Sequence, residues 1–268
     1  MSKTIDHVAR RERGAELYRE IMCAEPPLPT TPRTATLLDF VFAEVWARPG
    51  LERRARRLVT LTATAGSSSK DTFAANAYGA LASGDLSIDE LGEFVLHFGV
   101  YCGWGQAETA ESIIQEQWRR LLAERGELHP GNRIHPVSDV PADQEERKQR
   151  GERHFAEINC VPAVGRGVPY QDDGILNFVF GDMWLRPGLS VRDRRWITIA
   201  AVGISDTAIP IQSHVGSALE SGDVSIGEML ELCLQFAVYA GWPKGSMLNT
   251  TIAEQWARVE GKRSVTGG

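Results

Sequence analysis

The chain has 268 residues, of which 43% are hydrophobic and 24% charged, and its formal net charge is −6. This composition is ordinary for a globular protein with two domains or with one domain made of two halves, and the negative charge argues against nucleic-acid binding. No apolar run approaches the roughly 20 residues that span a bilayer, and residues 1–13 lack the apolar stretch of a signal peptide. We therefore expect a cytoplasmic protein without membrane partners.

All of the predicted elements are helices, and no segment alternates long enough to predict a strand. Leu91, Phe94 and Phe98 follow the helical period, and Gly103 closes that helix. Capping boxes are predicted at Ser87–Glu90 and Ser225–Glu228. The basic run 53–57 is interpreted as a solvated or ion-paired helix start. In chain order, the predicted helices cover residues 8–22, 34–47, 52–65, 70–82, 87–101, 105–124, 142–158, 172–185, 190–203, 207–220, 225–239 and 243–260.

The sequence contains two copies of one motif. Residues 40–118 align without a gap with residues 178–256, and 33 of the 79 aligned positions are identical. The pattern Trp-x-Arg-Pro-Gly-Leu, for example, occurs at 46–51 and at 184–189. Because repeats of this kind define architecture, we predict a first repeat at 1–125, a linker at 126–141, a second repeat at 142–260 and a disordered tail at 261–268.

These motifs resemble the carboxymuconolactone decarboxylase family, whose all-helical fold is shared with AhpD-type hydroperoxidases. The resemblance rests on Val-Trp-x-Arg-Pro-Gly-Leu or its variant, the Arg-rich helix start that follows, His214-x-x-x-Ala-Leu, and Tyr-x-Gly-Trp at 101–104 and 239–242. It implies an all-α, AhpD-like helical bundle whose two tandem repeats pack as a pseudo-dimer. It also implies cofactor-free loss of CO2 in aromatic compound catabolism. A homo-oligomer, a trimer of fused pairs, is expected by analogy with single-domain relatives.

The hydroperoxidase branch uses the motif Cys-x-x-Cys-x-x-x-His, and this chain departs from it in both repeats. The two cysteine positions are Ser69 and Thr72 in the first repeat, and Thr207 and Pro210 in the second. A thiolate is the nucleophile in that chemistry. Thiol peroxidase activity is therefore not expected.

The family's helix histidine distinguishes the two repeats. His214 occupies this position in the second repeat, whereas Asn76 occupies it in the first. A histidine can take and return a proton near neutral pH, while an amide can only orient a substrate. We therefore expect one proton-transfer centre at His214, with the alternative that His214 is a hydrogen-bonded core residue. Family decarboxylases often carry an acidic residue shortly before this histidine, and here Gln212 and its neighbours replace it.

Arginines and aromatic residues complete the expected pocket. Arg186 and Arg48 suit a carboxylate because a guanidinium grips it with two parallel hydrogen bonds. Their acidic neighbours Asp182 and Glu44 are candidate pocket residues and, in the alternative, the arginines' salt-bridge partners. The remaining candidates are Tyr239 as a catalytic hydrogen-bond donor, and Trp184, Trp46, Tyr101 and His97 as substrate contacts, with core packing or helix capping as the alternative.

The leading hypothesis is a cofactor-free enzyme, a carboxy-lyase or isomerase, that acts on a small unsaturated carboxylic acid or lactone. The alternative is a catalytically silent small-molecule-binding or assembly protein on the same fold. No metal site is predicted, since His129 and His135 lie in the linker region without a nearby acidic partner, and no phosphate-binding glycine motif is present.

Overall fold

A computed structural model describes residues 6–67, 69–130, 139–205 and 207–266, and these residues form helices and no strand. Every other residue lies outside the described part, including His135 and the centre of the predicted linker. None of the described helices combines the length and the apolar surface that a bilayer crossing demands. The first-repeat elements are α1 (His7–Met22), α2 (Pro32–Thr36), η1 (Leu37–Trp46), α3 (Arg53–Gly66), α4 (Lys70–Ser83), α5 (Ile88–Cys102) and α6 (Trp104–Arg125). The second-repeat elements are α7 (Gln144–Asn159), η2 (Tyr170–Val179), η3 (Met183–Leu185), α8 (Val191–Ser205), α9 (Ala208–Ser221), α10 (Ile226–Ala240) and α11 (Trp242–Thr266).

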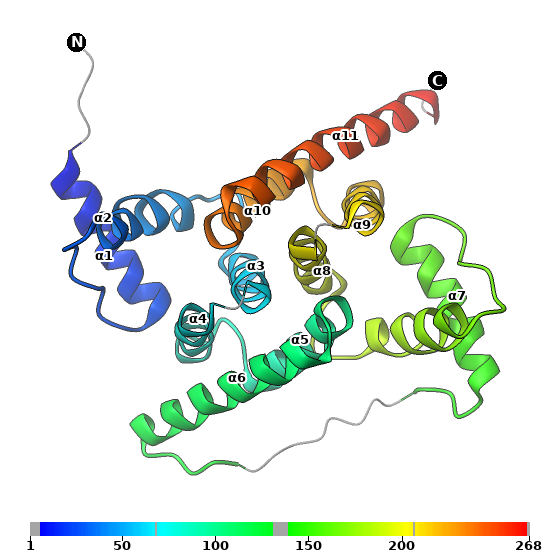
Figure 1. The fold of residues 1–268 in the computed structure, drawn as a ribbon, viewed down its shortest axis with the longest axis horizontal. Coiled ribbons are helices and arrows are strands. Elements are labelled where there is room, and N and C mark those ends of the chain that lie inside the picture. The colour runs from blue at the N-terminus through cyan, green and yellow to red at the C-terminus, as the bar shows by residue number, and fades with distance from the viewer. Residues whose placement is uncertain (1–5, 68, 131–138, 206, 267–268) are drawn as a thin grey trace.

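Helices from both repeats form the centre of the molecule. Figure 1 shows α3 and α8 side by side, with α5 and α6 along one edge and α10 and α11 along the opposite edge. Helix α5 of the first repeat packs on α8 of the second, and α10 of the second packs on α3 of the first. These reciprocal contacts support the predicted pseudo-dimer.

The hydrophobic core is continuous across the repeats. One large cluster includes Leu58 and Phe94 from the first repeat together with Trp196 and Phe236 from the second. Two smaller clusters lie beneath the flanking helices, one under α1 and one under α7. Since burial of apolar surface dominates folding, the shared cluster joins the two repeats into one folding unit.

The predicted caps are confirmed, whereas one predicted helix is interrupted. Both capping boxes form, and Gly103 and Gly241 end α5 and α10 with positive φ. The helix predicted at 172–185 is wrong: η2 ends at Val179, and a turn separates it from the short η3. Gly181, which replaces Ala43 of the first repeat, lies in this turn, and a Cβ there would meet the carbonyl oxygens of Leu176 and Asn177 on η2 and of Arg147 on α7. The tight turn after η2 and the close approach of α7 therefore both require glycine, which is a weak helix former.

The C-terminal helix is longer than the sequence predicts. Helix α11 continues to Thr266, so its last six residues overlap the tail that was expected to be disordered from 261.

At the repeat boundary, α6 ends at Arg125 with Gly126 as its cap, and α7 begins after Asp143, whose carboxylate accepts a hydrogen bond from the Glu146 amide.

Candidate functional site

The predicted second-repeat residues meet side chains from the first repeat. Because α5 lies against α8, one buried polar cluster draws on both copies of the motif. We call it the His214 cluster; its members are Glu93, His97, Tyr101, Trp184, Arg186, Arg194, Thr198 and His214.

His97 connects two other members of the cluster and is completely buried. Its Nδ1 lies 3.3 Å from Nη1 of Arg194, and its Nε2 lies 2.7 Å from the Thr198 hydroxyl. A guanidinium can only donate, so Nδ1 accepts and the neutral ring carries its proton on Nε2. Burial, reinforced by the positive charge of Arg194, lowers the pKa of His97 well below its usual range. The ring is therefore a neutral hydrogen-bond bridge.

Tyr101, rather than Tyr239, is the tyrosine beside His214. The two ring centroids are 5.4 Å apart in an edge-to-face arrangement. The Tyr101 hydroxyl accepts a hydrogen bond of 3.1 Å from the Trp184 indole, and burial raises its pKa to about 12. The hydroxyl thus keeps its proton at neutral pH. Tyr239 instead accepts a hydrogen bond of 2.9 Å from Trp46, away from His214.

His214 is a buried imidazole with an unused nitrogen. Only 9% of the residue is exposed, and its Nδ1 has no hydrogen-bond partner. Burial first, and the positive charge of Arg195 second, lower the pKa of His214 to about 3. In the free protein the ring is therefore neutral near pH 7. Arg195 itself is held by Asp223, Ser217 and the carbonyl of Ile158.

The two arginines predicted to bind a carboxylate are engaged by glutamates of the opposite repeat. Arg186 donates to both oxygens of Glu93 at 2.8–3.0 Å, and Arg48 donates to both oxygens of Glu231 at 2.5–2.8 Å. The alternative partners proposed from sequence are therefore wrong. Glu44 pairs with Arg10, and one carboxylate oxygen of Asp182 is buried without a hydrogen-bond partner.

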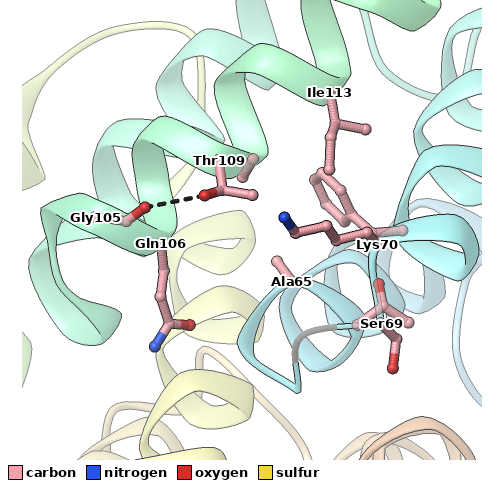
Figure 2. A pocket seen from close by; sticks show the side chains of 10 residues that line it. Ala65, Ser69, Lys70, Gly105, Gln106, Thr109 and Ile113 are labelled. Carbon is pink, nitrogen blue, oxygen red and sulfur yellow. Dashed lines mark hydrogen bonds between the residues drawn. The ribbon is translucent and has the colours of Figure 1, made fainter.

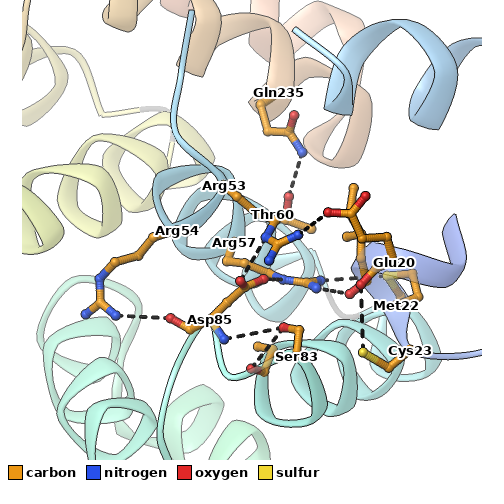
Figure 3. A network of polar contacts seen from close by, with 12 residues as sticks. Glu20, Met22, Cys23, Arg53, Arg54, Arg57, Thr60, Ser83, Asp85 and Gln235 are labelled. Atoms are coloured by element: carbon orange, nitrogen blue, oxygen red, sulfur yellow. Dashed lines mark hydrogen bonds and ion pairs between the residues drawn. The ribbon is translucent and has the colours of Figure 1, made fainter. Parts of the chain in front are cut away.

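A matching cluster forms where α10 of the second repeat packs on α3 of the first, and it has amides in place of both histidines. Gln235 replaces His97: its Oε1 accepts from Arg56 at 3.1 Å, and its Nε2 donates to Thr60 at 2.9 Å. Figure 3 shows Gln235 directed toward Thr60. Asn76 replaces His214, and its Oδ1 is also buried and unpartnered while its Nδ2 bonds the Thr72 carbonyl.

Buried arginines anchor the frame of both clusters. Arg57 is completely buried and donates to Asp85, as Figure 3 shows, and to the Ile21 carbonyl. Its guanidinium carbon lies 5.3 Å from the centroid of the Trp46 ring. Arg56 is buried as well and pairs with Glu231 at 3.0 Å. The predicted ion pairing of the run 53–57 is confirmed, but a solvated helix start is wrong for these two residues. The signal in the sequence was that both arginines recur at 194 and 195.

Two cavities lined by described residues do not open onto this cluster. One of about 240 Å3 lies beside α9 and α11, where Gln212, Ser213 and Ser217 line it, and a second lies between α4 and α6. His214 lines neither of them. In the described ranges, no group of three or more His, Cys, Asp or Glu side chains is placed to hold a metal ion.

Comparison with known proteins shows the family of the chain. The profile of the carboxymuconolactone decarboxylase family matches residues 172–246. Nitrosuccinic acid decarboxylase npaB of Metarhizium robertsii is 35% identical over 103 residues, which are 38% of this chain and 71% of that protein. The chain belongs to the carboxymuconolactone decarboxylase family. The 4-carboxymuconolactone decarboxylase of Acinetobacter baylyi is 32% identical over 82 residues, 31% of this chain and 60% of that relative.

The family match covers only one side of the His214 cluster. It includes Trp184, Arg186, Thr198 and His214, whereas the α5 members come from the first repeat. Both named relatives are decarboxylases, which agrees with the expected carboxy-lyase.

Proposed function

We propose that this protein decarboxylates a small carboxylic acid at the His214 cluster. The observation that carries the proposal is the unpartnered Nδ1 of His214, whose ring lies edge-to-face with Tyr101, a tyrosine that keeps its proton at neutral pH. Buried polar atoms are normally hydrogen-bonded, so a free nitrogen is suited to a ligand or a transferred proton. Nε of Arg194, in the same cluster, is also buried without a hydrogen-bond partner.

Loss of CO2 leaves the bonding electron pair on the substrate carbon, and that carbon must then gain one proton. His214 is neutral in the free protein, but a carboxylate bound nearby raises its pKa because the opposite charge favours the imidazolium. The ring takes a proton from solvent as the acid binds and delivers it to the carbanion after CO2 leaves. Tyr101 donates a hydrogen bond to the oxygen on which negative charge develops.

The two relatives suggest the class of substrate. Nitrosuccinic acid and 4-carboxymuconolactone, the acids in their names, both carry an electron-withdrawing group that can delocalise the charge left by CO2. We propose the same class here, and the same proton step would also allow isomerisation or ring opening. Carboxylate binding by Arg186 requires that the substrate compete with Glu93, and for Arg48 with Glu231.

The test is CO2 release from nitrosuccinate and from 4-carboxymuconolactone by the wild type and matched variants. His214→Asn installs the residue that the first repeat uses and should reduce kcat/KM at least about a hundredfold. Asn76→His is the reciprocal control and should leave turnover unchanged. Wild-type turnover that survives His214→Asn would remove His214 from the mechanism.

A catalytically silent binding protein is the second candidate. The paired arginines and the absence of His214 from both cavities favour it. If neither acid releases CO2 but either one raises Tm in the wild type and not in His214→Asn, binding without turnover is the function of the cluster.

A further inference from the structure

A separate cavity of about 120 Å3 lies in the first repeat, between α4 and α6. Phe73, Ala110 and Ile113 form its apolar wall, and its polar lining includes Lys70, Gln106 and Thr109. Figure 2 shows the Lys70 side chain extending from α4 toward α6, with its ammonium nitrogen on the side of Thr109. None of these residues belongs to the His214 cluster.

Lys70 supplies a positive charge at this cavity. It is exposed, and within the described ranges no hydrogen bond or ion pair joins it to another residue. The Thr109 hydroxyl is already used, since it donates to the Gly105 carbonyl at 3.2 Å. A ligand that enters the cavity therefore meets one positive charge beside an apolar wall.

The aligned positions of the second repeat carry different residues. Ala208 replaces Lys70, so no cation stands at the start of α9. Met247 and Leu248 replace Thr109 and Ala110, and Leu248 is completely buried in the core. The ammonium group of the nearby Lys244 is already hydrogen-bonded, because it donates to the Ile204 carbonyl at 3.1 Å. At this position, apolar space and the Lys70 charge thus occur together in the first repeat. The cavity beside α9 and α11 has a different lining, and its two cations, Arg258 and Lys262, are bonded to Gln255 and Glu220.

We propose that this cavity binds a small monocarboxylic acid with an apolar body, such as an aromatic ring or a short alkyl chain. The carboxylate pairs with Lys70, and the body packs against Phe73, Ala110 and Ile113. Ligand sites commonly combine apolar walls with a few charged groups that fix orientation. A single ammonium matches the charge of one carboxylate, whereas a phosphate dianion would keep an unpaired charge against an apolar wall.

The test is calorimetric titration of the full chain with benzoate and with benzamide, its neutral analogue of similar shape. Benzoate should bind, and benzamide should bind about three- to tenfold more weakly, as expected for the loss of one partly exposed charged contact. Lys70→Ala, which installs the second repeat's residue, should weaken benzoate by the same factor and leave benzamide unchanged. His214→Asn should bind both compounds as the wild type does.

A second variant tests the cavity itself. Thr109→Met with Ala110→Leu installs the larger side chains of the second repeat and should abolish binding of both compounds, with circular dichroism and Tm checking that the variant folds. If it does not fold, Lys70→Ala decides alone. The proposal is overturned if millimolar benzoate does not bind the wild type, or if Lys70→Ala binds it unchanged. Because no decarboxylation is measured, these outcomes are independent of the proposed activity.

Discussion

His97 and Gln235 occupy matched positions and make the same two hydrogen bonds. Each accepts from a buried arginine and donates to a threonine hydroxyl. An amide cannot transfer protons near neutral pH, so the shared role of this position is to connect the arginine to the threonine. His214 differs, because its Nδ1 is free and its first-repeat counterpart Asn76 retains a free oxygen.

Replacement of His97 should therefore depend on shape and hydrogen bonding. His97→Gln should leave Tm nearly unchanged and keep turnover within about threefold, since Gln235 already makes both bonds in the matching cluster. His97→Leu should cost about 1–3 kcal/mol for each buried group left unpaired, at Arg194 and Thr198. Urea unfolding and CO2 release measure the two effects. Loss of turnover in His97→Gln as large as in His214→Asn would mean that His97 also transfers protons.

The low pKa of His214 predicts a pH-dependent stability. A histidine in the unfolded chain titrates near 6.5, whereas His214 in the folded protein titrates at about 3. Between pH values of about 6.5 and 3, this histidine is protonated in the unfolded state and neutral in the folded state. The free energy of unfolding therefore falls as the pH falls below about 6.5. The contribution of His214 is roughly 1.4 kcal/mol per pH unit.

Comparison of urea unfolding for the wild type and His214→Asn between about pH 6 and pH 4 isolates this contribution. The variant should lose stability less steeply, while both proteins should show the same slope above about pH 7.5. Parallel curves throughout would contradict a neutral, buried His214.

At the level of elements, glycines set how closely the flanking helices approach. Gly14 on α1 and Gly151 on α7 are buried, and a Cβ at either position would overlap the carbonyl oxygen of Leu38 or Leu176 on the facing η1 or η2. That close packing places α1 and α7 over Trp46 and Trp184. The carbonyls of Ile21 and Ile158, in the last turns of these two helices, accept hydrogen bonds from Arg57 and Arg195.

Gly151→Ala should therefore cost at least about 2 kcal/mol, because a backbone atom cannot move aside as a flexible side chain can. Gly92→Ala is the matched control: Gly92 is exposed on α5 with open space around its Cα, and the change should stabilise by about 0.5–1 kcal/mol. Denaturant unfolding measures both. Equal stability of the two variants would show that α7 does not approach η2 so closely.

At the scale of the whole molecule, the two repeats depend on one another. The pairs Arg186–Glu93 and Arg48–Glu231 cross between them, as does the main hydrophobic cluster. Unfolding should accordingly be a single cooperative transition.

Glu231→Gln tests this coupling. It removes one charge from α10 and leaves the buried Arg56 of the first repeat without its carboxylate, at a cost of about 2 kcal/mol. Hydrogen exchange should show reduced protection in the cores of both repeats. Destabilisation confined to the second repeat, or two separate unfolding transitions, would contradict a shared folding unit.

The expected trimer of fused pairs stays a prediction. Trp104 and Trp242 are matched, 62% and 57% exposed, and offer apolar surface on both repeats. Light scattering would give the mass directly, and a monomer across micromolar concentrations would rule the trimer out.

The sequence by itself determined the repeats, nearly all helix positions, the caps and the family. These features are local or come from comparison of one copy with the other: a capping box is set by residues three apart, and Asn76 against His214 is visible in the alignment. Burial of Arg56 and Arg57 was not predicted. An amphipathic basic helix start has the same sequence pattern whether its guanidinium groups are solvated or bonded to buried carbonyls and carboxylates.

Only the tertiary structure decided which residues share a site. Tyr101 and Tyr239 are equivalent in the alignment, and the sequence assigned Tyr239 to His214 because both belong to the second repeat. In the structure, Tyr101 lies beside His214, and Glu93 forms an ion pair with Arg186, because α5 packs against α8 of the other repeat. That choice depends on how helices far apart in the chain bury their apolar faces together, and no local pattern within either copy records it.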